Sequence, residues 1–156
     1  MHTLKGIQDE IAQAFKNAKI PRTESELSIG GIDGPYVIKH FLGRDQHDIE
    51  HSDFPSSLYM EDFSYMTTRA IEYYLPCVLR IMLRDPYDYD LWLYLYSFLH
   101  ANRKGKLNWN LQELDTKQMI AISIWAEYLY ELWQVKQPEY INPEEALNIT
   151  KSYKNG

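Results

Sequence analysis

Apolar residues recur at intervals of three or four along most of this chain, and this period constrains the fold more than any other feature. The clearest run starts at Asp115 and continues to about Val135. Its apolar positions are Met119, Ile122, Trp125, Ala126, Leu129, Leu132 and Trp133. This spacing places apolar side chains on one side of a helix, and Asp115 with Gln118 forms a capping box at its start. The sequence therefore predicts a long amphipathic helix here.

Other segments share this period and are bounded by residues that begin or end helices. No run of alternating residues competes for a strand. The stretch from Pro21 to Gly34 is rich in Ser, Thr and Gly and is predicted to be a loop. Further helices are predicted from Leu4 to about Lys19, from about Pro35 to Gly43, from Thr67 to Asp85 with a kink or a break at Pro76, from Asp88 or Asp90 to about Asn102, and from Pro143 toward Lys154.

The length of 156 residues suits one domain with one core. Together with the helical pattern, it predicts an all-α fold. We expect a compact single-domain bundle of about five to seven helices over residues 1–156, with a long acidic loop in its first half.

Composition and charge exclude several classes of function. A net charge of −6 disfavours nucleic-acid binding, which depends on clustered Lys and Arg, and no apolar stretch is long enough to predict a membrane span. The single Cys77 lies in an apolar run and cannot form an internal disulfide, and no signal peptide is evident, so we expect a cytoplasmic protein. The glycine-rich segment 30–34 lacks the Lys-Ser or Lys-Thr of a phosphate loop, and no cofactor is expected.

The segment from Arg44 to Asp62 is polar and strongly acidic, with one arginine against six acidic residues. Residues 44–57 show no sustained period, which predicts an irregular loop with one helical turn. Loops of this kind carry function more often than the elements that they join. A second segment, Asp85 to Trp92, interleaves acids with aromatics, a composition suited to a basic protein surface. The partner-binding residues predicted from both segments are Asp45, Asp48, Glu50, Asp53, Tyr87, Asp88, Tyr89 and Asp90.

His47 and His51 offer an alternative interpretation of the same loop. Two histidines four apart lie on one face of a helix and can share a zinc ion, and an adjacent carboxylate could act as the base. The pattern resembles that of metalloproteases with Asp48 in the place of glutamate. This alternative predicts a metal-dependent hydrolase.

The segment Phe63 to Pro76 resembles a family of small bacterial proteins of unknown function, whose members carry a Thr-containing helix start followed by Tyr-Tyr-Leu-Pro. Here that motif is Tyr73-Tyr74-Leu75-Pro76. The resemblance extends from the first predicted helix, through the sequence HFLGR at 40–44, to LDTKQ at 114–118. It implies no established activity and no catalytic residues.

Three hypotheses for function follow from these observations. The first is a noncatalytic protein-binding module, an immunity or inhibitor protein of the cytoplasm that neutralises a toxin or an enzyme with a basic surface. The second is the hydrolase built on His47 and His51. The third is a structural or regulatory protein that forms a homodimer through its surplus of aromatic residues, which include 13 tyrosines and 4 tryptophans.

Overall fold

The all-α prediction is confirmed by a computed structural model, which describes residues 2–32, 34–53, 61–103 and 114–154. Over these residues the only β pairing is an isolated bridge between Ser28 and Met66. The α-helices are α1 (Leu4–Ala14), α2 (Glu24–Leu27), α3 (Gly34–Phe41), α5 (Thr68–Arg84), α6 (Tyr89–Arg103), α7 (Thr116–Val135) and α8 (Pro143–Lys154). Three short 3-10 helices, η1 (Gln46–Asp48), η2 (His51–Asp53) and η3 (Phe63–Tyr65), lie between α3 and α5.

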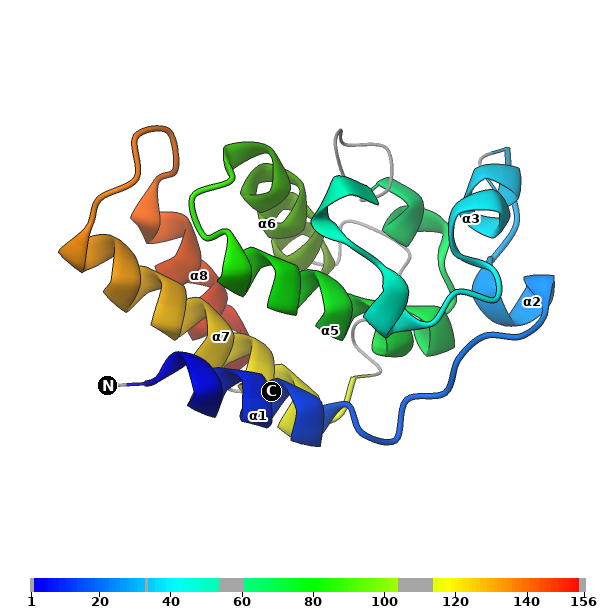
Figure 1. Cartoon of the computed structure of the whole chain (residues 1–156), viewed down its shortest axis with the longest axis horizontal. Coiled ribbons are helices and arrows are strands. Elements are labelled where there is room, and N and C mark those ends of the chain that lie inside the picture. Colours follow the sequence, from blue (N-terminus) through cyan, green and yellow to red (C-terminus); the bar gives the residue numbers. More distant parts are fainter. Residues whose placement is uncertain (1, 33, 54–60, 104–113, 155–156) are drawn as a thin grey trace.

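The helices form a bundle with α5 near its middle (Figure 1). At one end α7 packs along α8 and also along α1, and α6 contacts α8. At the other end α2 and α3 pack together, and α2 also contacts the start of α5. None of the helices described is long and apolar enough to cross a membrane.

Helix α5 forms the centre of the core, because 12 of its 17 residues are buried. Thr67 caps it by accepting a hydrogen bond from the Ala70 N–H, as its sequence predicts. The helix continues without interruption through Pro76, so of the predicted kink and break, the break does not occur. Proline removes one helical hydrogen bond, and the dense packing on both sides of Pro76 holds the helix together across that gap.

Three tryptophans join the helices at one end of the bundle. The ring of Trp92 lies 5.9 Å from that of Trp125 and 5.0 Å from that of Trp133, and all three side chains are buried. Each indole N–H has an acceptor on another element, as buried tryptophans require. The acceptors are Glu145 Oε1 for Trp92, the Leu79 carbonyl for Trp125 and the Pro86 carbonyl for Trp133.

Two predicted boundaries are wrong. The loop predicted from Pro21 to Gly34 contains α2, whose Thr23 and Glu26 make a complete capping box. The first helix ends at Ala14, earlier than the predicted Lys19. The helix predicted from about Pro35 to Gly43 is α3. Gly43 follows its end and has a φ of 77°, a backbone conformation that favours glycine.

Candidate functional site

The acidic segment after α3 has a defined local structure. It consists of the two 3-10 turns η1 and η2, which are separated by the buried Ile49 and by Glu50. Asp45 starts η1 by accepting a hydrogen bond from the His47 N–H at 2.8 Å. The segment predicted to be irregular with one helical turn thus contains two short 3-10 turns within residues 46–53, and residues 54–57 of that prediction lie outside the part described.

Side chains of α5 hold this segment in place. The Tyr74 hydroxyl lies 2.7 Å from the carbonyls of both Phe41 and Arg44, and the Tyr73 hydroxyl accepts from the Gln46 N–H at 3.2 Å. Arg80 donates to the Gln46 side chain at 2.6 Å. The tyrosine pair of the Tyr-Tyr-Leu-Pro motif thus fixes the backbone that carries the acidic residues.

Asp53 closes the segment on itself. Its Oδ2 accepts hydrogen bonds from the Glu50 N–H at 2.7 Å and from the Arg44 guanidinium at 3.0 Å. Burial opposes the charged form, but these donors outweigh it and hold the pKa of Asp53 below its ordinary value. Asp53 therefore supports the segment from within and is not an open surface carboxylate.

His51 connects the two predicted halves of the partner-binding site. Its Nε2 lies 2.5 Å from Asp88 Oδ2 and its Nδ1 lies 3.5 Å from Asp85 Oδ2. The second oxygen of Asp88 accepts from the Leu91 N–H at 3.0 Å and so caps α6. Residues 44–53 and 84–90, separated by 30 positions in the sequence, consequently lie against each other.

The eight residues predicted to bind a partner fall into two groups. Tyr87 donates a hydrogen bond to the Lys136 carbonyl, carries the Lys136 ammonium 4.9 Å above its ring, and has a raised pKa because of partial burial. Tyr87, Asp53 and Asp88 are thus used in contacts within the protein: Asp88 joins the two segments through His51, Asp53 bonds within residues 44–53, and Tyr87 bonds to Lys136. The five that are exposed to solvent are Asp45, Asp48, Glu50, Tyr89 and Asp90.

Tyr140 extends this surface and was not predicted. Its ring packs edge to face on that of Tyr89 at 6.2 Å, and the two residues are 72% and 42% exposed. Tyr140 lies on the connection between α7 and α8, 51 positions after Tyr89. No local pattern marks Tyr140, because the contact depends on how the start of α6 and the connection between α7 and α8 meet in the folded chain.

The pairing of His47 with His51 on one helical face does not form, because the two lie in separate 3-10 turns. Over the described residues, two groups of side chains have ligand atoms close enough to hold a metal ion: one is His51 with Asp85 and Asp88, and the other is His2 with Glu127 and Glu131. His47 belongs to neither group.

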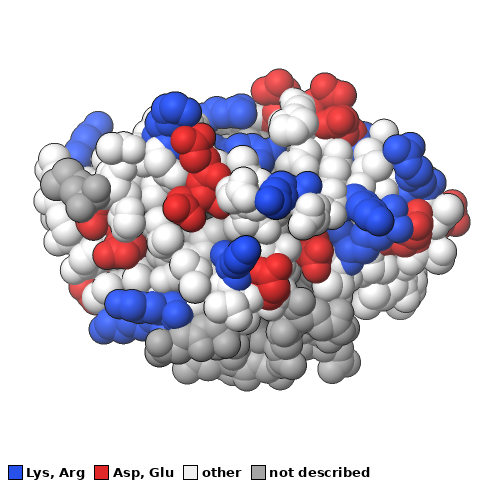
Figure 2. All heavy atoms as spheres, turned by 90° about the horizontal axis from the view of Figure 1, so that it is seen from below, with Lys and Arg blue, Asp and Glu red and all other residues white. Residues whose placement is uncertain are grey.

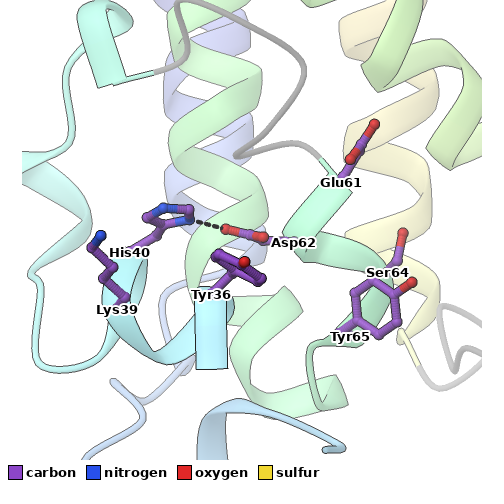
Figure 3. Close-up of a pocket in the computed structure, with 7 residues that line it drawn as sticks. All are labelled: Tyr36, Lys39, His40, Glu61, Asp62, Ser64 and Tyr65. Carbon is purple, nitrogen blue, oxygen red and sulfur yellow. Dashed lines mark hydrogen bonds and ion pairs between the residues drawn. The ribbon is translucent and has the colours of Figure 1, made fainter. Parts of the chain in front are cut away.

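A pocket of about 520 Å³ lies between α3 and η3 (Figure 3). His40 Nδ1 and Asp62 Oδ2 are 2.5 Å apart at its wall, and their side chains are 15% and 7% exposed. Ser64 also lines the pocket, but in Figure 3 it lies beside Tyr65 with its hydroxyl directed away from the histidine. The ion pair therefore joins two elements without presenting a serine to the histidine.

Cys77 offers no nucleophile either. Its side chain is buried within α5, and burial raises the pKa of the thiol to about 11, with nearby arginines opposing the shift. A thiol with this pKa is almost entirely protonated near neutral pH, and only the thiolate is reactive.

Comparisons with protein-family models, with curated proteins and with solved structures found no match to this chain. Function must therefore be argued from the site itself.

Proposed function

We propose that this chain is a noncatalytic protein-binding module that holds a basic partner through residues 44–53, residues 84–90 and Tyr140, a surface called the acidic face below. The observation that carries the proposal is the contact of His51 with Asp85 and Asp88. This contact unites two segments, each of which is acidic in its own right, into one surface.

The charge of this face suits a basic partner. Residues 44–53 and 84–90 carry seven acidic side chains and two arginines, and one of those arginines, Arg44, is paired with Asp53. A surface of one sign attracts a partner of the opposite sign and raises its association rate. In the view of Figure 2, acidic side chains gather at the upper edge, and over the rest of the described surface positive and negative side chains are interspersed.

The aromatic pair supplies the apolar part of the contact. Tyr89 and Tyr140 pack against each other while both remain exposed, so burying them on binding costs little side-chain ordering. Tyrosine is enriched among the residues that dominate binding energy, because a large apolar ring carries a polar tip. Surrounding carboxylates would then pair with Lys or Arg of the partner at the rim.

A different protein fits this face better than a second copy of the chain does. A two-fold dimer formed through the acidic face would place like-charged surfaces together, which is unfavourable. An immunity or inhibitor protein of the cytoplasm, which covers the basic substrate-binding surface of a toxin or an enzyme, meets the same requirement of opposite charge.

The test is binding of purified proteins encoded by the neighbouring genes, measured by biolayer interferometry at several salt concentrations. For a true partner, reversing Asp48, Glu50 and Asp90 to lysine should weaken binding by more than about 10-fold, mainly through a slower association rate. Tyr89→Ala with Tyr140→Ala should act mainly on the dissociation rate.

A matched control reverses Asp9 and Glu10, exposed acids on α1 far along the chain from the acidic face, and should leave binding unchanged. Binding that survives the reversal at positions 48, 50 and 90, or that shows no dependence on salt, would contradict the proposal. Light scattering that gives a dimer, disrupted by Tyr140→Ala, would favour the homodimer instead.

A further inference from the structure

A second group of potential metal ligands lies where the start of the chain meets α7. His2 precedes α1, and Glu127 and Glu131 are one helical turn apart on α7. His2 Nε2 lies 3.4 Å from Glu127 Oε2, and one ligand atom from each of the three residues lies within 4.8 Å of the others. Two carboxylates thus converge on one imidazole nitrogen.

Glu131, a partly buried residue, provides a second observation on this group. Its Oε2 has less than 1 Å² of exposed surface and has no hydrogen-bond partner over the described residues. A buried carboxylate oxygen without a donor is costly, and such atoms in folded proteins call for an explanation such as an ion. Glu127 adds a like charge four residues away on the same helix, which increases the cost.

From this geometry we infer that His2, Glu127 and Glu131 form a binding site for a divalent transition-metal ion such as Zn²⁺. One imidazole nitrogen and two carboxylate oxygens are ligands that suit these ions, whereas Mg²⁺ and Ca²⁺ prefer oxygen alone. In tetrahedral coordination with bonds of about 2.0–2.1 Å, neighbouring ligand atoms are about 3.4 Å apart. The distance between His2 Nε2 and Glu127 Oε2 already has this value.

The other histidine group does not share these properties. His51 and Asp88 are only 2.5 Å apart, which is a direct hydrogen bond and too close for two ligands of one ion. Both ring nitrogens of His51 face carboxylates, and the second oxygen of Asp88 caps α6. All three residues at that site are therefore used in holding the acidic face together.

Metal binding at His2, Glu127 and Glu131 would tie the start of α1 to the middle of α7. The ion would neutralise the two glutamates and would give the Glu131 carboxylate a partner. Because a site of this kind exists only in the folded chain, binding stabilises the fold by an amount that grows with the logarithm of the metal concentration above the Kd. The site is separate from the acidic face, so this inference does not depend on the proposed function.

The test uses the full chain with its own amino terminus, without a histidine tag, after treatment with EDTA. Calorimetric titration with Zn²⁺ should give one ion per chain, and bound Co²⁺ should show the visible absorption of a site with low coordination number. At a Zn²⁺ concentration about 100-fold above the Kd, the Tm should rise by roughly 5–10 °C. Mg²⁺ and Ca²⁺ should produce no comparable rise.

Glu131→Gln and His2→Ala should each weaken Zn²⁺ binding by at least about 10-fold, since loss of even a supporting residue has this effect on metal sites, and at the same Zn²⁺ concentration the Tm rise should fall to about half or less. His51→Ala is the matched control and should leave the stoichiometry at one. Without metal, Glu131→Gln should be as stable as the parent or more so, because it replaces a carboxylate whose buried oxygen has no donor, and this shows that the variant folds. The inference is overturned if no stoichiometric binding occurs, if binding survives both substitutions, or if it is lost in His51→Ala.

Discussion

At the scale of single residues, the Tyr74 hydroxyl makes the contact that connects the core to the acidic face. It is buried and lies 2.7 Å from two main-chain carbonyls, those of Phe41 and Arg44. We expect Tyr74→Phe to lower the free energy of unfolding by about 1–2 kcal/mol, because both carbonyls lose their shared donor while remaining enclosed. Urea denaturation followed by circular dichroism measures the change.

Tyr36→Phe is the control for this substitution, since that ring is 57% exposed and loses the same hydroxyl without disturbing buried carbonyls. It should change the free energy of unfolding by less than about 0.5 kcal/mol. Equal effects of the two substitutions would show that the Tyr74 hydroxyl contributes nothing specific.

Cys77 should be inert in the folded protein and reactive in the unfolded chain. Burial raises its pKa to about 11 from an ordinary value near 9.0, so the thiolate that reacts with disulfide reagents is scarce at pH 8. Reaction with Ellman's reagent should be at least about 100-fold slower in buffer than in 6 M guanidinium, at the same pH. Comparable rates in the two conditions would mean that the thiol is accessible without unfolding.

The same shift has a consequence for stability at high pH. Because the folded state holds the thiol proton more tightly than the unfolded state does, the contribution of Cys77 is fully present below about pH 9 and is lost as the pH rises toward 11. Cys77→Ala should flatten this part of the stability profile. A profile that remains unchanged after the substitution would assign the decline to other groups, such as Tyr74, whose pKa burial also raises.

At the scale of secondary-structure elements, capping signals in the sequence are more reliable than breaker residues. Asp115 and Gln118 predicted the start of α7, and both hydrogen bonds of that capping box are present. The same signal at Thr23 and Glu26 marks α2, but it was obscured by the loop-like composition around it. Pro76 predicted either a kink or a break, and of these two the break does not occur: α5 continues through Pro76, because burial on all sides outweighs the local preference.

The capping box of α7 leads to a prediction for the longest helix. Asp115→Ala removes the acceptor of the Gln118 N–H and should lower the free energy of unfolding by about 1 kcal/mol. Asp115→Asn retains an acceptor and should cost much less, which separates capping from charge. Thermal denaturation measures both variants, and an equal loss in the two would attribute the effect to the charge near the helix start.

At the scale of the whole molecule, the candidate site depends on contacts that no local pattern contains. The sequence identified both acidic segments, but neither the His51 to Asp88 contact nor the packing of Tyr89 on Tyr140 could be inferred from spacing. Each of these contacts joins two residues that are 37 or more positions apart in the sequence. Their meeting is decided by the packing of α5, α6 and α7, which sequence periodicity leaves open.

The same packing predicts that both ends of the bundle unfold together. At one end, the Thr67 N–H at the start of α5 donates to the Leu27 carbonyl of α2 at 3.0 Å. At the other end, Trp125 of α7 donates to the Leu79 carbonyl of α5 at 3.1 Å. A single core cluster extends from Ile7 to Tyr153 and includes both regions. Neither end can therefore lose its structure without exposing apolar surface of α5.

We accordingly expect guanidinium unfolding to be a single transition over the whole chain. Tryptophan fluorescence reports mainly on the end that contains Trp92, Trp125 and Trp133, whereas far-ultraviolet circular dichroism reports on all helices. The two curves should coincide and give one midpoint, as in other single domains of this size. If the fluorescence changes at a denaturant concentration at which much of the helical signal persists, the two ends unfold separately, and the shared packing on α5 does not couple them.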